Sequence, residues 1–118
     1  MTTDLFSSFV FEDLHIGQKA THSVVVCDSL ISSFANLTGD RHPLHTDREY
    51  SVSNGFQDIL AHGVLLTSLS SKLIGMDLPG ERALLLSNKS EYIKPVYPGD
   101  VLLFSATVSF LIPRARKG

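Results

Sequence analysis

Hydrophobic residues follow two different spacings along this chain, and together they predict a protein of strands and helices. Residues 19–27 are rich in β-branched side chains and end in the apolar run Val24-Val25-Val26-Cys27, which predicts a strand buried on both faces. Residues 101–112 alternate apolar with small polar side chains, which predicts a strand whose apolar face covers a helix. Residues 83–96 are a further strand candidate, separated from 101–112 by the turn Pro98-Gly99-Asp100.

Helical spacing is found in three other stretches. Asp28 or Ser29 is expected to cap a helix that ends at Gly39, where a left-handed conformation is expected. The apolar face of this helix is expected to consist of Leu30, Phe34 and Leu37. A second, short helix over residues 48–54 is expected to begin with a capping box formed by Thr46 and Glu49 and to be closed by Gly55.

The longest helical pattern covers residues 61–78 and ends at Pro79-Gly80. Its apolar residues occupy more than one face, so most of this helix should be enclosed by other elements. Its main apolar face is formed by Leu65, Leu66, Leu69, Leu73 and Met76.

Composition narrows the class of protein. The 118 residues suit a single domain over residues 1–118, and 43% hydrophobic with 19% charged residues is ordinary for a globular protein. A net charge of −2 argues against a nucleic-acid partner, and the basic residues Arg114, Arg116 and Lys117 are interpreted as a solvated end. The single Cys27 is expected to be a buried small hydrophobe. No signal peptide or membrane-length apolar run is found, so we expect a cytoplasmic protein without a membrane partner.

The densest cluster of proton-transfer side chains lies in residues 37–47, where Asp40, His42, His45 and Asp47 surround a glycine and a proline. Each of them alone has an ordinary structural explanation, and Asp47 is assigned to the start of the next helix. A proline-stiffened turn that holds Asp40 and His45 together, however, favours an acid/base pair. A metal site built from Asp40, His42 and His45 is the alternative. Its spacing matches no established metal motif, so no metal and no cofactor are expected.

His62-Gly63 stands at the start of the longest helix, where unpaired backbone N–H groups are expected. The Gly63 amide could stabilise the negative charge that develops on a thioester oxygen. A tight entry turn explains the same glycine equally well.

Four sequence motifs resemble those of the MaoC-like dehydratase family, which includes (R)-specific enoyl-CoA hydratases. They are Phe34-Ala35-Asn36-Leu37-Thr38-Gly39-Asp40, His42-Pro43-Leu44-His45-Thr46-Asp47, Ala61-His62-Gly63-Val64-Leu65 and Lys94-Pro95-Val96-Tyr97-Pro98-Gly99-Asp100. The resemblance implies an α+β hotdog fold, in which an antiparallel sheet wraps a long central helix. It also implies a homodimer joined through sheet edges and an acyl-CoA or acyl carrier protein thioester as ligand.

By the same resemblance Asp40 and His45 are the catalytic pair, and Gly63 supplies the oxyanion amide. Ser71 is a supporting serine. The expected substrate-binding residues are Gly63, His62, Ser71 and Pro43.

The sequence departs from the family pattern in two places. His42 stands where the family commonly has Asn, so His42 is a candidate modulator of the site. The sequence also stops at Gly118, whereas such folds continue after the strand that ends near Ile112 with two more strands. We therefore expect a chain that is short at its C-terminus, or a sheet that a partner chain or a swapped strand completes.

The expected reaction is reversible hydration of a trans-2-enoyl-CoA to the (R)-3-hydroxyacyl-CoA. In this mechanism Asp40 accepts a proton from water, His45 orients the water and supplies a proton to C2, and Gly63 stabilises the enolate. Two alternatives are a 3-hydroxyacyl carrier protein dehydratase or acyl thioesterase, and a non-catalytic hotdog subunit that dimerises or binds acyl chains.

Overall fold

A computed structural model describes residues 6–113, which form two compact units. The first unit comprises the described parts of Met1–His22, Ser71–Leu86 and Phe104–Gly118. The second comprises Ser23–Ser70 and Ser87–Leu103. The expectation of one domain over 1–118 stays a prediction, and the basic residues Arg114, Arg116 and Lys117 lie outside the described residues.

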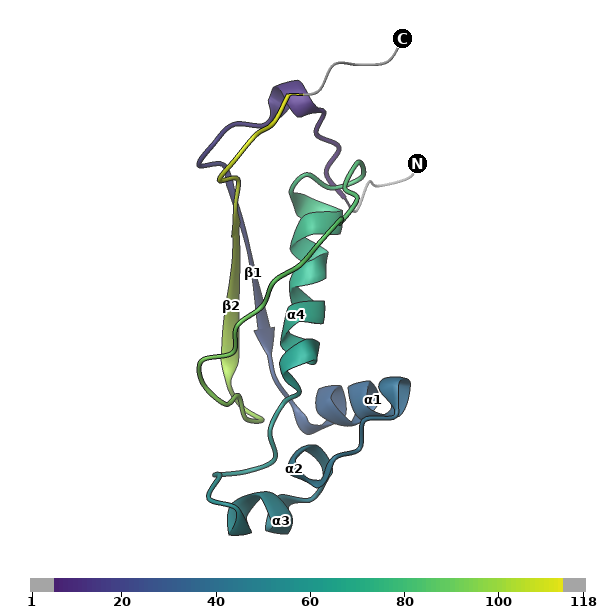
Figure 1. Ribbon diagram of the computed structural model, residues 1–118, viewed down its shortest axis with the longest axis vertical. Coiled ribbons are helices and arrows are strands. Elements are labelled where there is room, and N and C mark those ends of the chain that lie inside the picture. The colour runs from purple at the N-terminus through teal and green to yellow at the C-terminus, as the bar shows by residue number, and fades with distance from the viewer. Residues whose placement is uncertain (1–5, 114–118) are drawn as a thin grey trace. The chain divides into compact units, whose positions relative to one another are not determined.

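Strands β1 (Lys19–Val25) and β2 (Val101–Thr107) pair side by side in a two-stranded sheet (Figure 1). The register is antiparallel, because Val108 N–H donates to Gln18 O at 2.9 Å at one end and Val26 N–H donates to Asp100 O at 2.8 Å at the other. Side chains in both strands alternate between exposed and half-buried. The prediction that 19–27 is buried on both faces is therefore wrong: Val26 is fully buried, but it lies just after the strand.

The predicted strand over residues 83–96 is wrong, because none of these residues forms a strand. Leu84, Leu86 and Ile93 are 82%, 82% and 88% exposed. Their apolar run has no alternation, and among residues 6–113 no strand pairs with it. Strand β2 is also shorter than the predicted 101–112, and Phe110 and Ile112 beyond it are mostly exposed.

Three short helices, α1 (Asp28–Thr38), α2 (Pro43–Thr46) and α3 (Arg48–Ser53), lie together within the second unit (Figure 1). Gly39 ends α1 with a φ of 80°, as expected for the left-handed position. The buried residues of α1 are Ile31 and Ala35, whereas Leu37, expected on the apolar face, is 83% exposed. Leu30 and Phe34 are partly buried and pack against the hydrophobic core as predicted, so the prediction is wrong for Leu37 alone.

Two predicted helix caps are wrong. The residue that precedes α1 is Cys27, not Asp28 or Ser29, and its side chain makes no capping bond. Cys27 is exposed rather than buried, and its Sγ lies 3.1 Å from Ser29 Oγ, which lowers the pKa of the thiol. The cap of α3 is Asp47, whose carboxylate accepts the Tyr50 N–H at 3.1 Å. Its placement at a helix start is thus confirmed, and Thr46 instead ends α2.

Helix α4 (Gly63–Lys72) continues as a π-helical turn, η2 (Leu73–Asp77), and the two together agree well with the helix predicted over 61–78. The core of the second unit packs around Leu65 of α4 and consists of Val26, Ile31, Ile59, Ala61 and Leu65. In the first unit Leu73 and Leu78 are buried, and a short 3₁₀ turn, η1 (Phe11–Asp13), precedes β1. No helix among residues 6–113 is long and apolar enough to cross a membrane.

Replacing Ile31 with Ala should lower the free energy of unfolding by about 2–5 kcal/mol, because Ile31 is fully buried in this core. Leu37→Ala is the matched control on the same helix and should change it by no more than about 0.5 kcal/mol. Urea unfolding followed by circular dichroism measures both. Equal losses would contradict the placement of the apolar face.

Candidate active site

The turn between α1 and α2 positions the first half of the site. Thr38 Oγ1 accepts the Asp40 N–H at 3.1 Å, and Asp40 Oδ1 accepts the His42 N–H at 3.3 Å. Pro43 then begins α2, where a missing N–H costs nothing and the fixed φ suits the first helical position. This turn delivers His45 onto α2 five residues after Asp40.

His42 has a structural explanation in the same turn. Its Nδ1 accepts the Leu44 N–H at 3.1 Å, so the side chain caps α2. Asn is among the best capping residues, and an imidazole with a lone pair on Nδ1 can perform the same function. The difference from the family pattern at position 42 therefore keeps a cap in place.

Residues 60–62, just before α4, form the second half of the site through three hydrogen bonds. Leu60 N–H donates to Leu44 O at 2.8 Å, and Leu60 O lies 2.7 Å from His45 Nδ1. His62 Nε2 lies 2.9 Å from Asp40 O. These bonds join two segments that are about twenty positions apart in the sequence.

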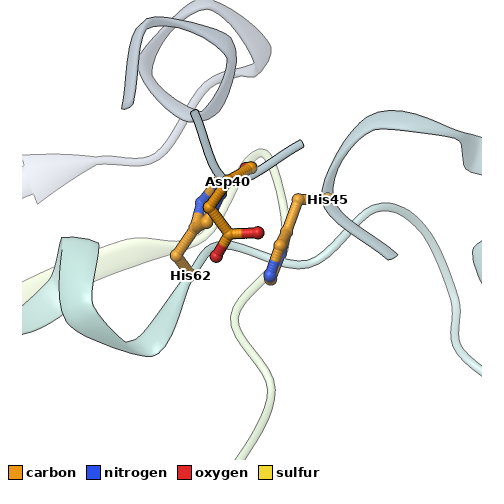
Figure 2. Close-up of side chains that lie close together, drawn as sticks. All are labelled: Asp40, His45 and His62. Carbon is orange, nitrogen blue, oxygen red and sulfur yellow. The ribbon is translucent and has the colours of Figure 1, made fainter. Parts of the chain in front are cut away.

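Asp40, His45 and His62 come together at this junction (Figure 2). Each offers one oxygen or nitrogen atom, and the three atoms lie within 4.8 Å of one another. The rings of His45 and His62 stack, with centroids 3.8 Å apart and an interplanar angle of 21°. Asp40 is exposed, His45 is half-buried and His62 is only 3% exposed.

The hydrogen bonds fix which nitrogen of each ring carries the proton. A backbone carbonyl can only accept, so His45 donates from Nδ1 and His62 donates from Nε2. Neutral His45 therefore has its lone pair on Nε2. Burial of the ring lowers the pKa of His45 and the His62 ring acts in the same direction, against the opposing effects of Leu60 O and Asp40. His45 is thus neutral at neutral pH, with an acceptor nitrogen available.

The same three side chains have the composition of a metal site, namely one carboxylate and two imidazoles. The set differs from the alternative in the sequence prediction, since His62 replaces His42. His42 uses its Nδ1 as a helix cap. Each of the other two rings already commits one nitrogen to a carbonyl, which leaves one nitrogen per ring for any further partner.

Two cavities adjoin His45 from different sides. One, of about 340 Å³, is mainly apolar and includes Gly63, Leu66 and Tyr92 in its lining. The other, of about 470 Å³, is more polar and is lined by Ser29, Ser32 and Arg48 among others. His45 therefore stands between an apolar and a polar compartment of the second unit.

Of the other predicted site residues, some line a cavity next to His45 and others do not. Gly63 begins α4 and lines the apolar cavity together with His45. Pro43 is exposed and lines neither cavity. Ser71 is exposed near the end of α4 and also lines neither cavity. Asp40 and His62 do not line them either; Asp40 is exposed, whereas His62 is only 3% exposed, so burial leaves His62 almost no surface for contact with a substrate.

Sequence reasoning missed Tyr92, which packs its ring directly on Gly63. A Cβ built on Gly63 would lie 2.7 Å from Tyr92 Cε2 and 2.8 Å from Cδ2. The Tyr92 hydroxyl bonds to Thr67 Oγ1, one turn along α4, and Thr67 also donates to Ser90 Oγ at 3.1 Å. The absence of a side chain at Gly63 thus lets the ring cover the first turn of α4.

Gly63→Ala should lower the free energy of unfolding by about 1–3 kcal/mol, because the added methyl group displaces the anchored Tyr92 ring. Gly75→Ala is the control, since a Cβ there meets nothing within 4 Å. In a Tyr92→Ala background the cost of Gly63→Ala should largely disappear. Urea unfolding of the four proteins of this double-mutant cycle measures the coupling, and an equal cost in both backgrounds would contradict the contact.

Known proteins that are similar to this chain are named as hydratases and dehydratases. The chain is 31% identical over 116 residues to an (R)-specific enoyl-CoA hydratase of Rhodospirillum rubrum, covering 98% of this chain and 81% of that protein. It is 33% identical over 107 residues to a 3-hydroxybutyryl-CoA dehydratase of Methylorubrum extorquens, covering 91% and 68%. The solved structure of the (R)-hydratase of Aeromonas caviae matches with a TM-score of 0.82 at 34% identity, covering 86% of this chain and 76% of that one.

These likenesses confirm the α+β hotdog fold that the sequence motifs implied. The profile of the family described as MaoC like domain matches residues 13–114, which include both halves of the site. The chain therefore belongs to the MaoC-like domain family.

Proposed function

We propose that this protein catalyses the reversible hydration of a trans-2-enoyl-CoA to the (R)-3-hydroxyacyl-CoA. The observation that carries the proposal is the pairing of Asp40 with a neutral His45 beside a largely apolar cavity. The relatives named as enoyl-CoA hydratase and 3-hydroxybutyryl-CoA dehydratase support the same reaction read in its two directions. The enzyme is then a hydro-lyase that acts on an acyl thioester.

Asp40 and His45 can hold one water molecule between them. The Asp40 carboxylate and His45 Nε2 are both acceptors, so the water donates one hydrogen to each and keeps an oxygen lone pair for C3. As the C3–O bond forms, the proton leaving the water moves to Nε2, and His45 then returns it to C2. This division of work differs from the sequence expectation, because a neutral His45 has no proton to supply until it has accepted one.

The start of α4 suits the charge that develops during this addition. First-turn amides such as Gly63 N–H have no acceptor inside their own helix, and the helix dipole favours a negative charge there. An enolate oxygen of the thioester placed at this amide would be stabilised while C2 awaits its proton. Gly63 lines the same cavity as His45, which is the relation that this step requires.

The apolar cavity is proposed to take the acyl chain. Its lining is dominated by side chains such as Phe56, Leu60, Leu66 and Val96, with Lys94 as the charged member. A volume of about 340 Å³ is near the lower end of small-molecule sites, roughly 300–1,000 Å³. The cavity therefore favours a short acyl chain.

Asp40→Asn and His45→Ala should each lower kcat/KM for crotonyl-CoA hydration by about 10²–10⁴-fold, the usual contribution of an acid/base group. Loss of the enoyl absorbance measures the rate. Asp47→Asn is the control: it removes a nearby carboxylate but keeps a capping oxygen for α3, so its rate should match the wild type. Unchanged rates in both site variants would refute the assignment, and release of free thiol by the wild type would indicate hydrolysis instead.

We also propose that two copies associate through their sheet edges. Each strand of the two-stranded sheet has one neighbour among the described residues, so each leaves an edge for further pairing. Some outward side chains of these strands are apolar and exposed, among them Val25 at 61%, Val101 at 67% and Leu103 at 71%. Sedimentation velocity should then give twice the mass of one chain at micromolar concentration. A single-chain mass across that range would contradict the proposal.

A further inference from the structure

The surroundings of His62 set it apart from an ordinary core residue. It is 3% exposed, lies immediately before α4 and contacts α1, α2 and the turn between them. Its Nε2 donates to Asp40 O at 2.9 Å, its ring stacks on His45 at 3.8 Å, and Phe34 of α1 meets its ring edgewise at 4.9 Å. Both members of the proposed catalytic pair are therefore held by one buried side chain.

The second nitrogen of His62 makes this arrangement costly. Nδ1 is buried, and no hydrogen-bond partner for it is found among residues 6–113. An unsatisfied buried polar atom destabilises the fold, because nothing replaces the hydrogen bond that it would make to water. A phenylalanine would fill the same space without that cost, but it would lose the bond to Asp40 O and with it one fixed point of the turn.

We infer that His62 is a positioning residue: it fixes the main chain of Asp40 and the ring plane of His45, and it does not contact the substrate. The inference rests on the proposed function, because it assigns Asp40 and His45 as the pair that is positioned. His62 is 3% exposed, unlike Asp40, and lines neither cavity next to His45, so its effect must pass through these two residues.

Two substitutions separate the two contacts. His62→Phe keeps a ring against His45 but removes the donor to Asp40 O. His62→Gln keeps an N–H at a position equivalent to Nε2 but removes the stacked ring, which opens the space beside His45 to water. We expect kcat for crotonyl-CoA to fall by about 10–100-fold in His62→Phe, because small displacements of reacting groups have effects of this size. In His62→Gln the fall should be smaller, and KM should stay within about twofold in both, since neither substitution touches the cavities.

The pH dependence gives a readout that a purely structural role would not change. The reaction needs neutral His45, so activity is lost as the pH falls through the pKa of this ring, which burial and the His62 ring hold below its ordinary value. In His62→Gln this pKa should rise toward the ordinary value of a histidine, and the acidic limb of the kcat profile should move to higher pH. In His62→Phe the acidic limb of the kcat profile should move less than in His62→Gln. The other charged or titratable groups that face His45 stay the same in both variants: Asp40, His42, Asp28, Arg48 and Lys94.

Nuclear magnetic resonance of the folded wild type tests the inference without any activity. Nitrogen-15 shifts should show His45 protonated at Nδ1 and His62 at Nε2, and His45 should titrate at higher pH in His62→Gln. Protonation of the other nitrogen in either ring would overturn the inference. So would His62 variants in which both the His45 titration and kcat are unchanged, or in which KM rises while kcat stays constant. A wild type without hydratase activity would refute the proposed function alone, because the tautomers and the titration still decide whether His62 positions the pair.

Discussion

The site depends on two hydrogen bonds that join α2 to Leu60, one with His45 and one with Leu44. Leu60 donates its N–H to Leu44 O and accepts from His45 Nδ1 with its own carbonyl. Helix α2 has only four residues, far below the length at which a helix is stable alone. Its orientation must come from such outside contacts, and the same contacts turn His45 Nε2 toward the reacting side.

The core of the second unit holds Leu60 in place. Ile59 and Ala61, on either side of Leu60, are both buried in the cluster around Leu65. Ala61 N–H also donates to Val96 O at 2.9 Å, and fully buried Ser51 donates to Asp58 O at 2.7 Å. The segment before α4 is therefore fixed by packing on its flanking residues and by hydrogen bonds, which lets its central residue serve the site.

Local signals in the sequence predicted much of this site. Gly39 and Asp47 have conformational or capping functions that depend on neighbours within a few residues, and their placement at a helix end and a helix start is confirmed. Pro43, predicted in a turn, instead begins α2, a four-residue helix that the sequence did not predict. Contacts between distant segments left no such signal, as the Tyr92 ring on Gly63 shows. Strand formation depends on distant partners as well, which is why residues 83–96 were assigned wrongly on composition. The absence of a cofactor and the cytoplasmic location stay predictions.

The acceptors that orient the two histidines are main-chain carbonyls, those of Leu60 and Asp40. A carbonyl belongs to the backbone and survives every substitution at its own position, provided that the path of the chain is kept. The residues that shape the apolar cavity can then change in size, and Leu60 itself among them, without removing the groups that fix the imidazoles. An arrangement of this kind allows substrate preference to diverge between related proteins while the geometry of proton transfer is inherited unchanged.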